Sequence, residues 1–212
     1  MIGILDLQGD VIEHLDHLER LGVPARRVKA PADLEGLVGL ILPGGESTCI
    51  SKLLRIFELH DALLAAHENG MKVWGTCAGA ILLARVVTGE KAHLGLIDIE
   101  IERNGFGSQL ESFICDASVP RVSEEKLPLT FIRAPKIRSV GPGVDVLLQI
   151  DDYVAAAESV SVLITIFHPE MTGSLAFHRH FAVKCGLTVN PEKNRNVTSW
   201  TATSWTRYAR IA

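Results

Sequence analysis

The stretch VWGTCAGA at residues 73–80 decides the fold, because an apolar run ends at Gly75, presents Cys77 and continues at once as a helix-forming sequence. This pattern is typical of a nucleophile elbow, a sharp strand-to-helix turn that exposes one reactive side chain. Glycines two positions to either side of the cysteine, Gly75 and Gly79, avoid collisions across such a turn. The helix that starts near Ala78 directs free backbone N–H groups and its positive dipole end toward the sulfur. The stretch therefore predicts a nucleophilic thiolate beside an anion-stabilising site.

Strand patterns alternate with helix patterns along the chain up to this turn. Strands are expected at residues 2–7, 25–29, 39–42 and 71–74, and helices at residues 11–21, 32–37, 50–57 and 59–66. Such alternation predicts a three-layer α/β fold with a mostly parallel, doubly wound sheet between helices. Ligands of these sheets bind outside the carboxyl ends of the strands. We therefore expect Gln8, the loop at residues 43–48 and Cys77 to meet at that edge.

The second half of the sequence has a different pattern of predicted elements. Shorter strand patterns, separated by glycine, proline and charge, lie at residues 97–102, 112–116, 129–133, 144–150 and 153–157. They predict an antiparallel or mixed extension of the sheet. The apolar run at residues 160–167 predicts a central strand, and residues 173–185 predict the last helix. We expect one domain at residues 1–187 and a poorly ordered tail at residues 188–212.

Length, charge and cysteine spacing narrow the class of protein. A chain of 212 residues is long enough for one enzyme-sized domain. A formal net charge of −4 without a basic stripe argues against a nucleic-acid partner. Neither a leader-like segment nor an apolar run of membrane-spanning length is evident. The four cysteines show neither CxxC nor metal-ligand spacing. We expect a cytoplasmic protein with free thiols, no bound metal and no membrane contact.

A second chemical pattern follows the apolar run at residues 160–167, where His168 and Glu170 flank Pro169. In extended backbone, alternate residues share a side. The carboxylate of Glu170 can then orient the imidazole of His168 while the imidazole accepts the proton of Cys77. The sequence thus predicts a Cys77–His168–Glu170 triad. The competing interpretations are a buried structural cysteine and a histidine that merely ends a strand.

The other histidines predict no site. His14 and His17 lie three apart on a predicted helix, but no third ligand lies nearby in the sequence, so a metal site is not expected. His178 and His180 lie two apart on a helix and are expected to diverge.

The loop PGGEST at residues 43–48 lacks the lysine and the spacing of a nucleotide-binding phosphate loop. Its glycines allow backbone N–H groups to approach a ligand closely. We therefore expect an oxyanion hole that faces Cys77, and a helix that begins at Ser47 or Thr48.

Several motifs together resemble the class I (triad) glutamine amidotransferases. These motifs are PGGEST at 43–48, GTCAG at 75–79, ERNGFGSQ at 102–109, FIRAP at 131–135 and FHPE at 167–170. With LQGDVIEH at 7–14, they more narrowly resemble the glutaminase subunits of pyridoxal 5'-phosphate synthase, over about residues 1–187. The resemblance implies a class I glutamine amidotransferase fold, which is flavodoxin-like.

The resemblance also implies an activity. L-glutamine would be hydrolysed to glutamate and ammonia through a thioester on Cys77, without a cofactor, and the ammonia would pass to an oligomeric, barrel-shaped synthase subunit. The family's glutamine-contacting positions map onto Gly45, Glu46, Ser47, Arg103, Ile132 and Arg133. Backbone N–H groups of Gly45 and Ala78 would face the oxyanion, and Gln8 would lie near the site and the subunit interface. An α-carboxylate favours an arginine fork, from Arg103 or Arg133.

The chain departs from the family pattern in several places. Ser108 stands where the family usually has arginine, residues 163–166 are bulkier than usual, and the tail after residue 190 has no counterpart in the family pattern. Two other functions stay open. One is a stand-alone γ-glutamyl hydrolase on the same scaffold, and the other is a non-enzymatic, redox-sensing binding protein with an oxidisable cysteine.

Overall fold

The computed structural model describes residues 1–103, 105 and 112–189, and its elements follow the predicted alternation at first. The strands are β1 (Ile2–Leu5), β2 (Ala25–Val28), β3 (Gly39–Leu42), β4 (Lys72–Thr76), β5 (Ala84–Val87), β6 (Ile97–Glu102), β7 (Phe113–Ala117), β8 (Leu127–Phe131), β9 (Lys136–Val140), β10 (Asp145–Ile150), β11 (Tyr153–Glu158) and β12 (Val162–Thr165). The helices are α1 (Val11–Arg20), α2 (Ser47–Ile56), α3 (Leu59–Glu68), α4 (Ala78–Leu83) and α5 (Ala176–Lys184), with short 3-10 helices η1 (Pro31–Leu34) and η2 (Pro169–Met171).

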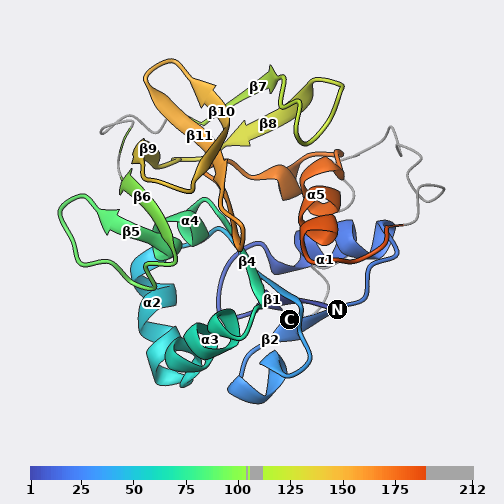
Figure 1. Cartoon of the computed structure of the whole chain (residues 1–212), viewed down its shortest axis with the longest axis vertical. Coiled ribbons are helices and arrows are strands. Elements are labelled where there is room, and N and C mark those ends of the chain that lie inside the picture. Colours follow the sequence, from blue (N-terminus) through green and yellow to red (C-terminus); the bar gives the residue numbers. More distant parts are fainter. Residues whose placement is uncertain (104, 106–111, 190–212) are drawn as a thin grey trace, which may run out of the picture.

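One large mixed sheet forms the centre of the molecule (Figure 1). Its strands run in the order β2-β1-β3-β4-β12-β11-β9-β6-β5, and β10 pairs with β11. Neighbours from β2 to β12 are parallel, whereas β11 is antiparallel to β12 and β9 is antiparallel to β6. The predicted parallel sheet with a mixed extension is confirmed. Strands β7 and β8 form a separate antiparallel pair.

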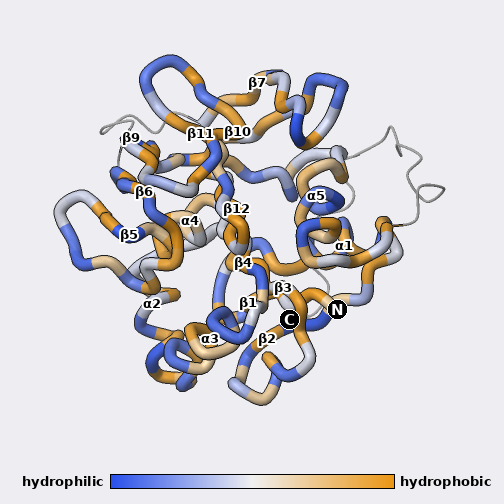
Figure 2. The backbone as a smooth tube through the Cα atoms, in the orientation of Figure 1, coloured by the Kyte–Doolittle hydropathy of each residue, from blue (hydrophilic) through white to orange (hydrophobic). Residues whose placement is uncertain are grey.

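Helices cover both faces of the parallel part of the sheet. In Figure 1, α1 and α5 lie together on one face, and α2, α3 and α4 lie on the other. Every residue of β1, β3 and β12 is buried, as strands covered on both faces require. Figure 2 shows apolar residues along these central strands and hydrophilic residues in the outer loops. The described part of the chain contains no helix of the length and apolarity needed to cross a bilayer.

The structure corrects several predicted boundaries. The first strand ends at Leu5 rather than at residue 7, and the helix expected at residues 32–37 is the single 3-10 turn η1. Pro31 starts this turn, and Gly36, at a φ of +71°, follows its end. Strands β5 and β9 were not predicted. Ser108 and residues 190–212 lie outside the described residues.

The strand that precedes His168 is central, as predicted, because β12 lies between β4 and β11. A side-chain hydrogen bond joins β4 to β12. The indole N–H of the fully buried Trp74 on β4 donates to Thr165 Oγ1 on β12 at 3.2 Å. Thr165 pairs in register with Thr76, whose own buried hydroxyl has no hydrogen-bond partner among the described residues. The two threonines therefore allow a matched comparison, because the hydroxyl of Thr165 accepts a hydrogen bond and the hydroxyl of Thr76 makes none with a described residue.

We expect Thr165→Val to lower the free energy of unfolding by about 1–3 kcal/mol, because the buried indole N–H of Trp74 loses its acceptor. Thr76→Val, which removes a hydroxyl without a partner, should leave the free energy unchanged or raise it. Urea denaturation of both variants measures the difference. Equal losses would show that the hydrogen bond contributes nothing.

Candidate active site

Cys77 lies at the junction of β4 and α4 in a strained backbone conformation. Its φ is 47° and its ψ is −103°, a combination that residues with a Cβ rarely adopt. Its N–H donates to the carbonyl of Thr165 at 2.9 Å, and its carbonyl accepts from the N–H of Ala80 at 3.1 Å. The predicted elbow is therefore present, and neighbouring backbone holds it in place.

Three glycines are required by close contacts around this turn. A Cβ on Gly75 would lie 2.5 Å from the backbone of Gly79, and a Cβ on Gly79 would lie 2.0 Å from the carbonyl oxygen of Leu42. The structure thus confirms that both positions must be small. The group that excludes a side chain at Gly79 is the end of β3, however, and not Cys77. A Cβ on Gly44 would lie 2.5 Å from His168 Cε1. This third requirement was not predicted.

His168 and Glu170 are adjacent, but not in the way predicted. The N–H of His168 donates to the carbonyl of Thr130 at 2.8 Å, and its ring Nδ1 lies 2.8 Å from Glu170 Oε1. The expectation of extended backbone is wrong, since Pro169 begins the 3-10 turn η2. This turn, rather than strand alternation, brings the carboxylate of Glu170 to the ring.

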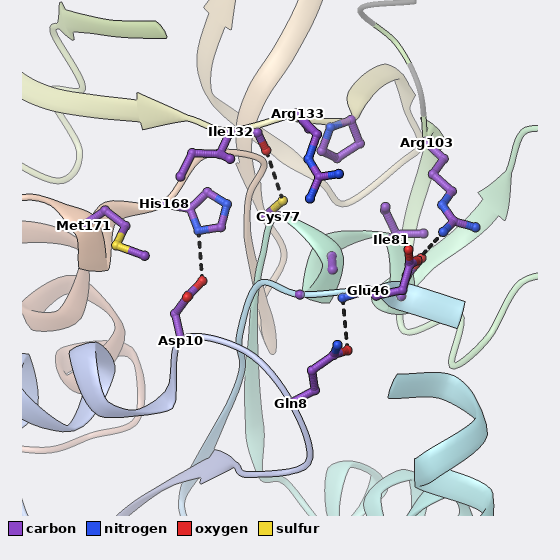
Figure 3. A pocket seen from close by; sticks show the side chains of 14 residues that line it. Gln8, Asp10, Glu46, Cys77, Ile81, Arg103, Ile132, Arg133, His168 and Met171 are labelled. Atoms are coloured by element: carbon purple, nitrogen blue, oxygen red, sulfur yellow. Dashed lines mark hydrogen bonds and ion pairs between the residues drawn. The ribbon is translucent and has the colours of Figure 1, made fainter. Parts of the chain in front are cut away.

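A second carboxylate, missed by the sequence analysis, also faces this ring. Asp10, which precedes α1, places Oδ2 3.3 Å from His168 Nδ1 (Figure 3). Asp10, His168 and Glu170 present three potential metal-ligand atoms within 4.8 Å of one another. The 2.8 Å separation within the group is the length of an N–H···O hydrogen bond, so we place a proton there.

Burial and the neighbouring carboxylates shift the pKa values of His168 and Glu170. Burial by itself lowers the pKa of His168, but hydrogen bonds with Asp10, Cys77 and Glu170 outweigh it and raise that pKa. Complete burial raises the pKa of Glu170, and the hydrogen bond from His168 opposes the rise. With Nδ1 committed to two carboxylates, Nε2 is the ring atom available to exchange a proton with Cys77.

These side chains line a cavity of about 410 Å³ at the carboxyl ends of the strands. The predicted site residues that line it are Gln8, Gly45, Glu46, Ser47, Cys77, Ala78, Arg103, Ile132, Arg133 and His168. Glu170 lies behind them with no exposed surface. Figure 3 shows Cys77 between His168 and Met171 on one side and Glu46 and Arg103 on the other. The lining residues that were not predicted are Asp10, Ile81, Pro135 and Met171.

The two arginines in the cavity differ in what they bind. Arg103 pairs with Glu46 and donates to Thr48 Oγ1 at 2.8 Å. Arg133, with a φ of 45°, extends its guanidinium into the cavity and makes no hydrogen bond or ion pair to another described residue (Figure 3). An incoming anion therefore finds Arg133 uncommitted, whereas Arg103 already holds a carboxylate.

The loop predicted as an oxyanion hole is held by its neighbours. The Glu46 N–H donates to Gln8 Oε1 at 3.2 Å, and helix α2 begins at Ser47, one of the two predicted positions. The Cys77 thiol lies across the cavity from this contact and donates to the carbonyl of Ile132 at 3.9 Å.

Comparison with known proteins gives consistent matches. The chain matches the SNO glutamine amidotransferase family over residues 4–187. It is 59% identical over 210 residues to pyridoxal 5'-phosphate synthase subunit PdxT of Syntrophus aciditrophicus (strain SB), covering 98% of this chain and 94% of that protein. This match includes most of the tail, so the tail does have a counterpart in a relative.

Two further matches cover nearly all of each relative. The subunit of the same name from Clostridium botulinum (strain Loch Maree / Type A3) is 48% identical over 185 residues, covering 86% of this chain and 96% of that protein. A solved structure described as a glutamine amidotransferase superimposes with a TM-score of 0.82 at 42% identity, covering 88% of this chain and 99% of its own.

We expect Asp10→Asn to lower the pKa of His168, because the substitution removes one of the carboxylates that favour the imidazolium. The midpoint of the ring's NMR titration should move to lower pH. Asp16→Asn, which changes a half-exposed acid of α1 that pairs with Arg20, is the control and should leave the midpoint in place. A midpoint that stays unchanged in Asp10→Asn would contradict the assigned contact.

Proposed function

The chain belongs to the SNO glutamine amidotransferase family, and from that premise we propose that it hydrolyses L-glutamine and supplies the ammonia to a pyridoxal 5'-phosphate synthase subunit. The observation that carries the proposal is the convergence of a thiol, an imidazole and a carboxylate at one cavity. Residues 1–187 would form the glutaminase unit, acting in the cytoplasm with a barrel-shaped, oligomeric acceptor subunit.

Cys77, His168 and Glu170 act as the catalytic triad in this proposal. His168 Nε2 accepts the thiol proton, and the sulfur attacks the side-chain amide carbon of glutamine. Nδ1–H remains bonded to Glu170, which keeps the lone pair of Nε2 facing Cys77. The imidazolium then returns its proton to the leaving nitrogen, so that ammonia departs and a γ-glutamyl thioester remains. Water, deprotonated by His168, hydrolyses the thioester to glutamate.

The oxyanion of each tetrahedral intermediate needs donors that are in place before the reaction. Backbone N–H groups of Gly45 and Ala78, which both line the cavity, supply them in our proposal. The Gln8 contact with Glu46 holds the loop that contains Gly45, and we place this contact beside the surface that meets the synthase subunit. Docking there can therefore influence the oxyanion hole directly.

Glutamine is oriented by its charged end. We assign its α-carboxylate to Arg133, which is uncommitted, and its α-ammonium to Glu46, which lines the same cavity. Ser47 and the carbonyl of Ile132 complete the polar lining. Arg103 holds Glu46 in position rather than binding the carboxylate itself.

We expect Cys77→Ala to reduce ammonia release from glutamine at least about a thousandfold, because no other group replaces the nucleophile. His168→Asn should cause a loss of similar size. The rate of the unaltered chain should rise when the synthase subunit is added. Cys115→Ser, which changes a cysteine on β7 away from the cavity, is the matched control and should retain activity.

Other outcomes of this assay identify the competing functions. Cleavage of folate polyglutamates without the synthase subunit would indicate a stand-alone γ-glutamyl hydrolase. Absence of turnover on either substrate, together with reversible oxidation of Cys77 that survives His168→Asn, would indicate a redox-sensing protein. Either result would overturn the proposed function.

We expect Arg133→Met to raise KM for glutamine about tenfold to a hundredfold and to change kcat by less than about threefold, since the lost bond to the α-carboxylate forms equally in the ground and transition states. Steady-state ammonia release measures both constants. The control is Arg121→Met, which alters an exposed arginine paired with Asp145. A fall in kcat without a rise in KM would contradict the assignment.

A further inference from the structure

Three histidines are completely buried between α1 and α5, next to the site. They are His14 and His17 of α1 and His178 of α5, and none has exposed surface. The rings of His17 and His178 lie 4.5 Å apart between centroids, and Trp74 packs edge-on against His178 at 4.8 Å. The predicted divergence of His178 from His180 is confirmed, since the latter contacts Glu158 at 3.0 Å.

One of these histidines reaches the far side of the carboxylate that holds His168. His14 Nε2 lies 3.7 Å from Glu170 Oε2. Each of these two atoms is buried, and neither has a hydrogen-bond partner among the described residues. The separation exceeds a hydrogen bond, but each atom is the polar group that the other faces. On its other side, His14 Nδ1 lies 2.8 Å from His178 Nε2.

The contacts therefore form a continuous chain from the cavity to α5. His168 Nδ1 binds Glu170 Oε1, Glu170 Oε2 faces His14, and His14 binds His178. The chain ends at His178 Nδ1, which is buried without a partner among the described residues. Two of its members were considered in the sequence only as a metal pair or a diverging pair, and so their link to Glu170 was missed.

Only one distribution of protons leaves every buried N–H of the histidine pair facing an acceptor group. If Glu170 is ionised, His14 Nε2–H faces Oε2 at 3.7 Å, a favourable contact of a dipole with a charge, and His178 Nε2–H donates to the lone pair of His14 Nδ1. His178 Nδ1 is then an unpaired acceptor. If Glu170 instead donates a proton to His14, the proton pattern reverses and His178 Nδ1–H becomes a buried donor without a partner. The second arrangement carries the larger desolvation cost.

The charges around the chain agree with neutral histidines. Burial is the main cause that lowers the pKa of both His14 and His178, and the neighbouring His17 adds to the effect. Arg20 also lowers the pKa of His178. The groups that face Glu170 are His168 of its own segment and Asp10 and His14 at the start of α1 and within it.

We propose that His14 is a positioning residue: it presents Nε2–H to the carboxylate of Glu170, is oriented by His178, and keeps that carboxylate ionised and directed at His168. The effect on catalysis rests on the proposed triad, whereas the arrangement of protons does not. His14 acts through Glu170 and touches neither substrate nor the reacting atoms. The buried histidine pair thus extends the triad to α5.

The proton arrangement is tested on the resting protein by NMR of ¹⁵N-labelled histidine. Both His14 and His178 should be neutral and protonated at Nε2 near neutral pH. A protonated Nδ1 on His14, or an imidazolium at either residue, would overturn the proposal. This measurement needs no turnover and no substitution, so it decides the matter even if a variant fails to fold.

The catalytic effect is tested by His14→Leu, for which kcat/KM should fall about tenfold. The acid limb of its pH profile should move to higher pH, because Glu170 without the donor protonates more readily. His14→Gln, which restores a donor, should recover most of the activity. His17→Leu is the matched control, since the His17 nitrogens contact the backbone carbonyls of Glu13 and Thr172.

The possible outcomes distinguish failure of the positioning role of His14 from failure of the proposed glutaminase function. An unchanged acid limb in His14→Leu, or an equal shift in His17→Leu, would overturn the positioning role while leaving the glutaminase function in place. Glutamine turnover that survives Cys77→Ala would overturn the proposed function, and the NMR result on the histidine pair would still stand.

Discussion

The parallel pairing of β4 with β12 is the constraint on which the site depends. Thr76 and Thr165 lie opposite each other, so both strands end at the same edge, where Cys77 follows Thr76 directly and His168 follows Thr165 by three residues. The bond from the Cys77 N–H to the carbonyl of Thr165 joins the elbow to the neighbouring strand. The conformation of the cysteine is thus fixed by the sheet, which makes the position of the thiol a property of the core rather than of a loop.

The neighbouring loops add a second constraint, because they leave little free space around the imidazole. Gly44 of the loop after β3 contacts His168 so closely that a methyl group would not fit, and Asp10 of the loop after β1 reaches Nδ1. Glu170 contacts the same Nδ1 at 2.8 Å and is fully buried. A buried carboxylate is costly unless hydrogen bonds compensate it, so the ring and the carboxylate stabilise each other's charged forms.

Sequence reasoning succeeded where the signal is local and failed where it depends on contacts across space. The elbow at Cys77 and the alternation of parallel strands with helices follow from glycine spacing and hydrophobic patterns. Strand β5 follows α4 without a break, so nothing in the sequence separates the two elements. Asp10 and His14 could not be assigned, because their roles depend on how α1 packs against η2 and α5. The turn at Pro169 was misjudged, since a histidine and a glutamate two apart suit both extended and 3-10 backbone.

In the proposed function, every turnover passes through an acyl group on one sulfur atom, that of Cys77. Mixing the enzyme and its synthase subunit with glutamine, quenching rapidly with acid and measuring intact mass with peptide mapping tests this directly. The account predicts a γ-glutamyl group on Cys77 that appears before steady state and is absent in His168→Asn. An adduct on a different residue, or glutamine hydrolysis that proceeds with no adduct and persists in Cys77→Ala, would contradict it.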